Sequence, residues 1–194
     1  PMRRVIGIGE TILDILFKNN QPTVAVPGGS VFNGLVSLGR AGANVTFISE
    51  VGGDRVGNLI LNFMKENGIS TDNVVVYPDR KSPVSLAFLN EKNDAEYSFY
   101  KDYPNLRLDA EMPEVTSDDI VMFGSFYAIT PQLRDKVKEL LDKAQKAGAI
   151  IYYDVNFRRN HAGEAIKLMS TVIENFEYAD IVKGSDEDFE VLYR

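Results

Sequence analysis

The sequence contains no cysteine among its 194 residues, which excludes disulfide bonds, thiolate catalysis and thiolate metal ligands. It contains one histidine, His161, so a metal site built from several histidines is also excluded. His161 lies in the polar stretch RRNHAGEA, which favours a solvent-exposed turn over a catalytic triad. The absence of cysteine fits the cytoplasm, where we expect this protein to reside.

Basic residues form no cluster. The formal net charge is −7, and no basic run is longer than Arg158-Arg159. Because nucleic-acid binding depends on clustered lysine and arginine, we expect no nucleic-acid partner. No apolar run approaches the roughly 20 residues that span a membrane. The N-terminus also lacks the three regions of a signal peptide, so we expect no membrane partner.

The hydrophobic pattern predicts strands and helices in alternation, which favours an α/β fold with a mostly parallel sheet covered on both faces. Thr130, Pro131 and Gly148 are typical N-cap, first-turn and C-terminal residues of one long helix. The predicted strands are 3–9, 44–49, 73–77, 149–154 and 179–184. The predicted helices are 30–41, 55–67, 130–147, 163–176 and one that begins at 185.

Two segments interrupt this alternation. Residues 11–27 and residues 82–101 read as short strands joined by polar turns, and the second is a hairpin candidate. They predict a small β-sheet carried by the α/β body as a cover over a site. We therefore assign residues 1–10, 28–78 and 112–194 to the body, and residues 11–27 and 79–111 to a β-rich lid.

The stretch PGGSVFN, residues 27–33, places two glycines at the start of a predicted helix. Glycine lets the main chain approach a ligand closely, and the first N–H groups of a helix lack internal partners. Such a junction can bind hydroxyls or anions. The alternative is an ordinary loop in which Ser30 is the N-cap residue.

Asp14 lies inside the otherwise apolar strand TILDILF. An unpaired charge there is costly, so the carboxylate is expected to face a cleft or to accept hydrogen bonds, for example from the vicinal hydroxyls of a sugar. The alternative is an edge-strand aspartate that faces water.

Polar side chains also follow two later strands. Asp154, Asn156 and Arg158 alternate just beyond the strand 149–154, at the edge of a parallel sheet where ligands bind. The alternative for these three is a solvated loop. The stretch VKGSDED follows the next strand, and its carboxylates could stabilise a helix N-terminus or position hydrated Mg²⁺.

Two nucleotide motifs are missing. In GIGETI, Ile12 occupies the place of the third glycine of a dinucleotide fingerprint, and strand rather than helix follows, which excludes an NAD-dependent oxidoreductase of that type. No G-x-x-x-x-G-K-[ST] phosphate loop is present either.

Taken in order, the remaining motifs resemble those of the ribokinase-like, or PfkB, carbohydrate kinases, most of all the fructokinase and 2-keto-3-deoxygluconate kinase branch. The likeness runs through essentially all 194 residues and rests on GETILDIL, GGSVFN, GGDRVG, YSFYK, DVNFR and VKGSDED. It implies a ribokinase-like α/β fold, a mostly parallel sheet flanked by helices with a small β-sheet lid. It also implies ATP and Mg²⁺ as cofactors.

The resemblance assigns roles to particular residues. In GGDRVG, Gly53 (or Gly52), Asp54 and Gly57 match the G-x-D-x-x-G segment of the family. The substrate-binding residues implied are Asp14, Gly28, Gly29, Asn33, Phe99, Lys101 and Arg158. The residues implied on the nucleotide and phosphate side are Asp154, Asn156, Lys183 and Ser185, with Asp188 as the metal ligand.

The sequence also departs from the family pattern. Val31 and Leu35 stand where small residues are usual, and Ser185 and Asp188 replace the usual asparagine and glutamate. Lys101 replaces a frequent arginine and cannot hold a carboxylate in a two-pronged contact, which disfavours an acidic sugar.

The G-A-G-D element, which carries the catalytic base of the family, occurs nowhere in the sequence. We expect this element, and the base with it, to lie beyond Arg194, the last residue. We therefore expect no catalytic base in this chain and interpret it as the N-terminal two-thirds of an ATP-dependent sugar kinase, inactive as residues 1–194 alone.

The expected reaction phosphorylates a sugar primary hydroxyl, with fructose as the first choice and 2-keto-3-deoxygluconate or ribose-type sugars as alternatives. The competing hypothesis is a non-catalytic sugar-binding or regulatory module. The expected partners are the sugar and ATP, and a homodimer through the lid is the assembly that related lids often form.

Overall fold

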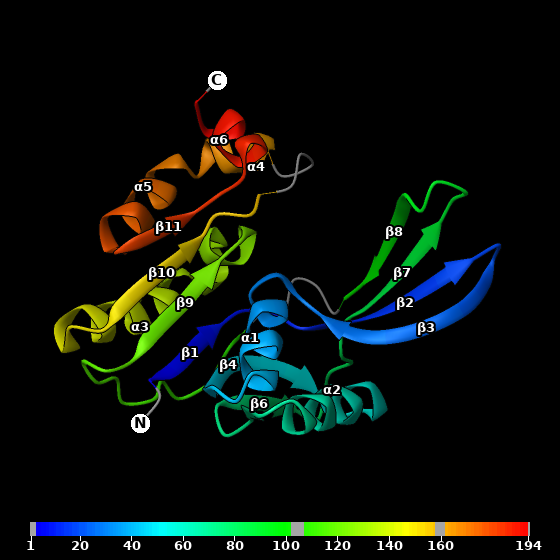
Figure 1. Ribbon diagram of the computed structural model, residues 1–194, viewed down its shortest axis with the longest axis horizontal. Helices are drawn as coiled ribbons and strands as arrows, with labels where there is room; N and C mark the ends of the chain where they lie inside the picture. Colours follow the sequence, from blue (N-terminus) through cyan, green and yellow to red (C-terminus); the bar gives the residue numbers. More distant parts are fainter. Residues whose placement is uncertain (1–2, 102–106, 158–161, 194) are drawn as a thin grey trace.

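A parallel seven-stranded sheet forms the body of the computed structural model, which describes residues 3–101, 107–157 and 162–193 (Figure 1). The strand order is β11–β10–β9–β1–β4–β5, and β6 also pairs with β4. Every pair in this sheet is parallel. Its strands are β1 (Arg4–Ile8), β4 (Asn44–Gly52), β5 (Ile69–Ser70), β6 (Val74–Tyr77), β9 (Ile120–Gly124), β10 (Ile150–Asp154) and β11 (Ile181–Lys183).

Helices cover both faces of this sheet. Side chains alternate between the faces along each strand, so a strand with apolar residues throughout has an apolar surface to bury on either side. In β1, Val5 packs into one apolar cluster, with α1 and α2, while Ile6 and Ile8 pack into the other, with α3 and α5. The predicted α/β class is thereby confirmed. The helices are α1 (Ser30–Arg40), α2 (Arg55–Glu66), α3 (Arg134–Ala147), α4 (Ala162–Lys167), α5 (Met169–Tyr178) and α6 (Asp186–Tyr193).

Two predicted helices need correction, and one central strand was not predicted. The helix expected at 130–147 begins as a 3₁₀ turn, η2 (Pro131–Leu133), and becomes α-helical only at Arg134. The helix expected at 163–176 is two helices separated at Leu168, and Ala165 of the first and Val172 of the second both pack into the core. The strand β9 was not predicted, although it lies between β1 and β10 in the sheet and is followed by a second 3₁₀ turn, η1 (Phe126–Ile129).

The smaller sheet consists of two hairpins joined side by side, and Figure 1 shows it extending away from the body. We call it the lid sheet: β2 (Ile12–Lys18), β3 (Gln21–Gly28), β7 (Val84–Leu89) and β8 (Ala95–Tyr100). Its order is β3–β2–β7–β8, with β2 parallel to β7 and the other pairs antiparallel. Asn19 and Asn20 close the first hairpin with φ of 52° and 59°, a conformation that asparagine tolerates well.

The chain returns from the lid sheet to the body before the boundary expected at residue 111. Leu108 and Ala110 are buried in the apolar cluster beneath α3, although both lie inside the range assigned to the lid. In the parts of the chain that are described, none of the helices combines the length and the apolar character needed to cross a membrane.

Candidate active site

A cavity of about 590 Å³ lies where the lid sheet meets the carboxyl ends of β1, β4 and β9. This volume is typical of a site for a small molecule, and the strand ends are where open α/β sheets bind ligands. Residues of both sheets form its wall. The predicted site residues that line it are Asp14, Gly29, Asn33, Phe99, Lys101 and Asn156.

Asp14 faces this cavity from an inner strand of the lid sheet. The strand β2 pairs with β3 on one side and β7 on the other, so the edge-strand alternative for Asp14 is wrong. The side chain is half-buried, and its Oδ1 accepts a hydrogen bond from the Ser85 hydroxyl on β7. A carboxylate oriented in this way keeps lone pairs free for the hydroxyls of a ligand.

The two glycines of PGGSVFN admit the Asp14 carboxylate and bend the backbone into α1. A Cβ atom on Gly28 would overlap Asp14 Oδ2, and Gly29 has a φ of 145°, which side-chain-bearing residues rarely adopt. Gly29 is the N-cap residue, so the alternative in which Ser30 caps the helix is wrong. Ser30 is instead the first helical residue, and its Oγ accepts a hydrogen bond of 2.6 Å from Asn156 Nδ2.

Phe99 and Lys101 approach the cavity from β8 and the residue that follows it. Lys101 Nζ lies 3.2 Å from Glu10 Oε2, just after β1, and 5.5 Å from the centre of the Phe99 ring. This ion pair joins the lid sheet to the body across the cavity wall. The Lys101 charge is thus already balanced by a carboxylate.

The residues predicted on the nucleotide side gather at the carboxyl ends of β10 and β11, next to the cavity. Asp154 is in register with Lys183, and the Val155 N–H donates to the Lys183 carbonyl at 2.9 Å. Burial raises the pKa of Asp154, while the Lys183 charge opposes this shift and the Asp188 charge adds to it. Asn156 alone of this group also lines the cavity.

Asp188 is buried and ties two loops together. Its Oδ1 accepts from the Phe157 N–H at 2.8 Å, and its Oδ2 accepts from the Ser185 N–H at 2.9 Å. The Ser185 hydroxyl accepts from the Asp188 N–H at 3.2 Å, so the two residues cap α6 reciprocally. This arrangement favours the helix-stabilising role that the sequence left open for the VKGSDED carboxylates.

The fit of Mg²⁺ rests on few protein ligands. Among the described residues, no group of three or more metal-ligating side chains occurs. Mg²⁺ commonly uses only one or two carboxylates together with waters and substrate phosphates, a pattern that Asp188 and the nearby Asp154 match in number. The metal role of Asp188 therefore stays a prediction.

Three residues that the sequence analysis singled out lie outside the residues that the structure describes: Arg158, His161 and Arg194. The substrate-binding role of Arg158 and the exposed turn around His161 therefore stay predictions. The same holds for a catalytic base beyond Arg194, because neither that residue nor anything after it is described.

Asp54 of GGDRVG does not line the cavity, but it holds neighbouring segments in place through hydrogen bonds. It is the N-cap residue of α2, accepting from the Gly57 N–H at 2.8 Å, and it accepts from both the N–H and the hydroxyl of Ser82. Burial alone would raise the pKa of Asp54, but these hydrogen bonds outweigh it and the pKa is lowered. The carboxylate thus anchors the segment that leads into β7.

Several cavity residues were not predicted from the sequence. Ser125 follows β9 with a φ of 54°, and because that strand was missed, its polar end was missed too. Glu10 lies two residues after β1, a position that could have identified it, whereas Glu50 lies within β4, near its carboxyl end. The cavity residues that sequence reasoning missed include Glu10, Thr11, Glu50, Arg80, Lys81, Tyr97, Ser125, Tyr127 and Thr130.

Comparison with known proteins identifies the family. Residues 2–194 match the pfkB family carbohydrate kinases, and the chain belongs to this family. It is 26% identical, over 97% of its length, to the probable chloroplastic fructokinase-6 of Arabidopsis thaliana. It spans 52% of that protein and 62% of fructokinase-1 of Oryza sativa.

Solved structures agree on the fold. The apo fructokinase of Vibrio cholerae O395 superposes with a TM-score of 0.83 at 20% identity, covering all of this chain and 67% of that one. The ATP-bound fructokinase of Xylella fastidiosa superposes with a TM-score of 0.80 at 25% identity, covering 99% of this chain and 64% of that one. The ribokinase-like fold predicted from the sequence is confirmed.

Proposed function

We propose that the protein encoded by the complete gene transfers the γ-phosphoryl group of ATP to a primary hydroxyl of a sugar, with fructose as the first substrate. The observation that carries this proposal is the shared cavity. Asp14, Gly29 and Asn33 on the expected sugar side and Asn156 on the expected nucleotide side line one space of about 590 Å³. The fructokinases among the relatives support the choice of fructose.

In this proposal the residues of the chain bind and orient the reactants. Asp14 and Asn33 hold sugar hydroxyls, while Lys183 and the polar groups around Ser185 face the phosphates. The lid sheet keeps out water that would otherwise accept the phosphoryl group. When bound, Mg²⁺ would neutralise charge on the transferring phosphate, held through Asp188 and the phosphate oxygens.

An ADP-release assay on the protein from the complete gene tests this function. Fructose, 2-keto-3-deoxygluconate and ribose are each supplied with ATP and Mg²⁺. We expect sugar-dependent ADP release at roughly 1–100 s⁻¹, highest with fructose. Sugar binding by calorimetry without ADP release would favour the non-catalytic module instead. No binding of any sugar would reject both functions.

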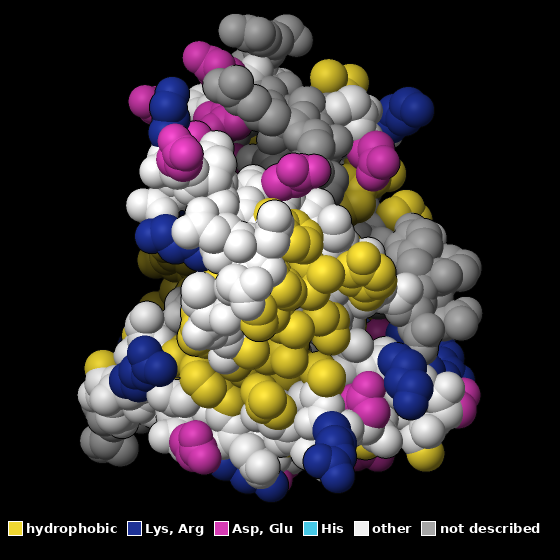
Figure 2. Space-filling model, turned by 90° about the vertical axis from the view of Figure 1, so that its right-hand side faces the viewer, with side chains coloured by type: hydrophobic (Ala, Val, Ile, Leu, Met, Phe, Trp, Pro, Cys, Tyr) yellow, Lys and Arg dark blue, Asp and Glu magenta, His cyan; other side chains and the backbone are white. Residues whose placement is uncertain are grey.

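We also propose that two copies pair through their lid sheets. The register of β3, β2, β7 and β8 places Asp14 on the same face as Val24, Val26, Tyr97 and Phe99, whose side chains are exposed. Figure 2, which views the molecule from the lid side, shows hydrophobic side chains gathered on this side. A second copy covering this face would bury this apolar patch, and exposed apolar patches can mark sites of protein–protein interaction.

Analytical ultracentrifugation should therefore detect a dimer, and Val24→Glu should convert it to a monomer. Val24 is 52% exposed and does not line the cavity. Val76→Glu is a matched control, because Val76 is 46% exposed but lies on β6 of the body. A monomeric parent, or dissociation by the Val76 variant alone, would contradict this arrangement.

A further inference from the structure

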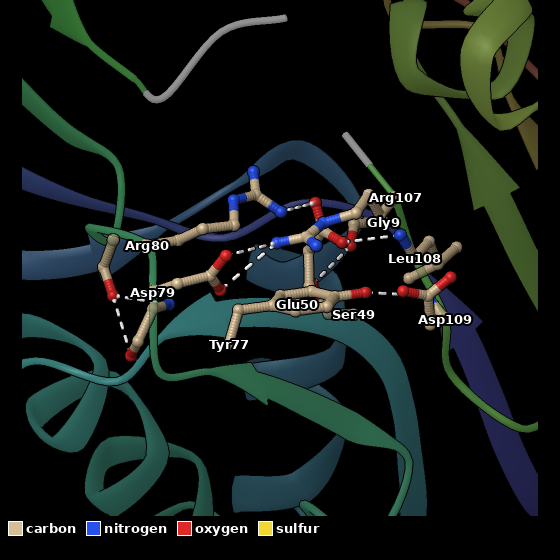
Figure 3. A network of polar contacts seen from close by, with 11 residues as sticks. Gly9, Ser49, Glu50, Tyr77, Asp79, Arg80, Arg107, Leu108 and Asp109 are labelled. Atoms are coloured by element: carbon tan, nitrogen blue, oxygen red, sulfur yellow. Dashed lines mark hydrogen bonds and ion pairs between the residues drawn. The ribbon is translucent and has the colours of Figure 1, made fainter. Parts of the chain in front are cut away.

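The two connections that join the β7–β8 hairpin of the lid sheet to the body meet at Glu50, near the carboxyl end of β4 (Figure 3). The outgoing connection runs through residues 78–83, and Arg80 Nη1 lies 3.3 Å from Glu50 Oε1. The returning connection passes residues 107–109, and the Leu108 N–H donates to Glu50 Oε2 at 2.7 Å. A single carboxylate thus holds two segments that are far apart in the sequence.

Tyr77, the last residue of β6, makes further contacts with both connections at this junction. Its hydroxyl accepts from the Asp109 N–H at 2.8 Å, and the guanidinium groups of Arg80 and Arg107 lie 5.1 Å and 4.5 Å from the centre of its ring. Figure 3 shows the ring between the two connections. Stacking of guanidinium on an aromatic ring restricts where both segments can lie.

The Glu50–Arg80 pair at this junction is largely buried, so removing either charge is expected to destabilise the junction. The side chains of Glu50 and Arg80 are 13% and 11% exposed, and the Arg80 Nε–H is buried with no hydrogen-bond partner. Losing one member of such a pair leaves the other charge uncompensated. Leu108 has a φ of 44°, a conformation that leucine rarely adopts, and the bond to Glu50 helps to hold it.

Glu50 and Arg80 also line the cavity, so the junction that holds the lid sheet is in contact with the space for the substrate. We propose that Glu50 is a positioning residue, which fixes the lid sheet over the cavity and thereby sets Phe99 and Lys101 against the sugar. This role rests on the proposed function. It assigns to Glu50 no contact with the reacting atoms.

Glu50→Gln and Glu50→Ala in the protein from the complete gene test this role. Glutamine keeps an oxygen for the Leu108 N–H but removes the charge beside Arg80, whereas alanine removes both links. We expect fructose affinity to fall by about three- to tenfold in the glutamine variant and by more than tenfold in the alanine variant, as for broken buried pairs. The KM for ATP should stay unchanged, and ADP released without sugar phosphate should increase, because a displaced lid admits water.

Asp79→Asn is the matched control. The Asp79 carboxylate pairs with Arg107 at 3.3 Å in the same network, but it is 69% exposed and does not line the cavity. Exposed pairs contribute little, so fructose affinity should stay within about twofold of the parent. Calorimetry and the melting temperature are measured for each variant.

The outcomes separate the two proposals. The positioning role would be overturned if Glu50→Gln left both the fructose affinity and the amount of ADP released without sugar phosphate unchanged. A lower melting temperature would not rescue it. If Glu50→Ala fails to fold, Glu50→Gln and Arg80→Met test the positioning role in its place. Both variants must then weaken fructose binding. If the parent binds no sugar, the proposed function fails and this inference fails with it.

Discussion

Replacing Asp14 with asparagine is expected to weaken sugar binding by about ten- to a hundredfold, the equivalent of a buried hydrogen bond to a charged group. The carboxylate lines the cavity and accepts one hydrogen bond from the Ser85 hydroxyl, which leaves acceptor sites for two sugar hydroxyls. Asparagine keeps the shape but offers only one acceptor oxygen. Its amide also turns two donors toward Ser85 or the ligand.

Calorimetry with fructose measures this loss, and Asp94→Asn supplies the control. Asp94 lies in the exposed turn between β7 and β8, so the same substitution there should leave affinity unchanged. The melting temperature of the Asp14 variant should stay close to that of the parent, because its neighbours Gly28 and Ser85 still fit an isosteric side chain. Equal fructose affinity in the Asp14 variant and the parent would remove Asp14 from the binding site.

The fold could be predicted where a strand or helix carries its own pattern. Helix α3 shows apolar residues at helical spacing and ends at Gly148, which adopts the left-handed conformation expected of a C-terminal glycine. The strand β9 was missed although VMFG is apolar. It is only five residues long and is followed by 3₁₀ turns rather than by the helix that alternation leads one to expect.

The same distinction applies to the residues of the candidate site. Asp14 could be predicted because a carboxylate in an apolar strand conflicts with its surroundings, and that conflict is visible in the sequence. Glu50 and Arg80 could not, because an acidic residue at the end of a strand and an arginine in a turn are ordinary in a sequence. Their importance arises only from pairing across thirty positions and from meeting Leu108, which no local pattern records.

The polypeptide of residues 1–194 alone is expected to form no sugar phosphate. Phosphoryl transfer needs a base near the acceptor hydroxyl and a dense set of donors around the transferring group. The carboxylates that line the cavity are already engaged: Glu10 with Lys101, Asp14 with Ser85, and Glu50 with Arg80 and Leu108. No two glycines lie close together in the sequence after residue 68, so it offers no glycine-rich anion site.

Single-turnover kinetics on purified residues 1–194 with ATP, Mg²⁺ and fructose test this expectation. Cooperative thermal unfolding first establishes that the polypeptide is folded, and calorimetry should detect weak fructose binding that Asp14→Asn abolishes. That residual binding follows from the position of Asp14, Gly29 and Asn33 within these residues. Sugar phosphate formed at about 1 s⁻¹ or faster would mean that one of the three cavity carboxylates is the base, since this is the range of working kinases.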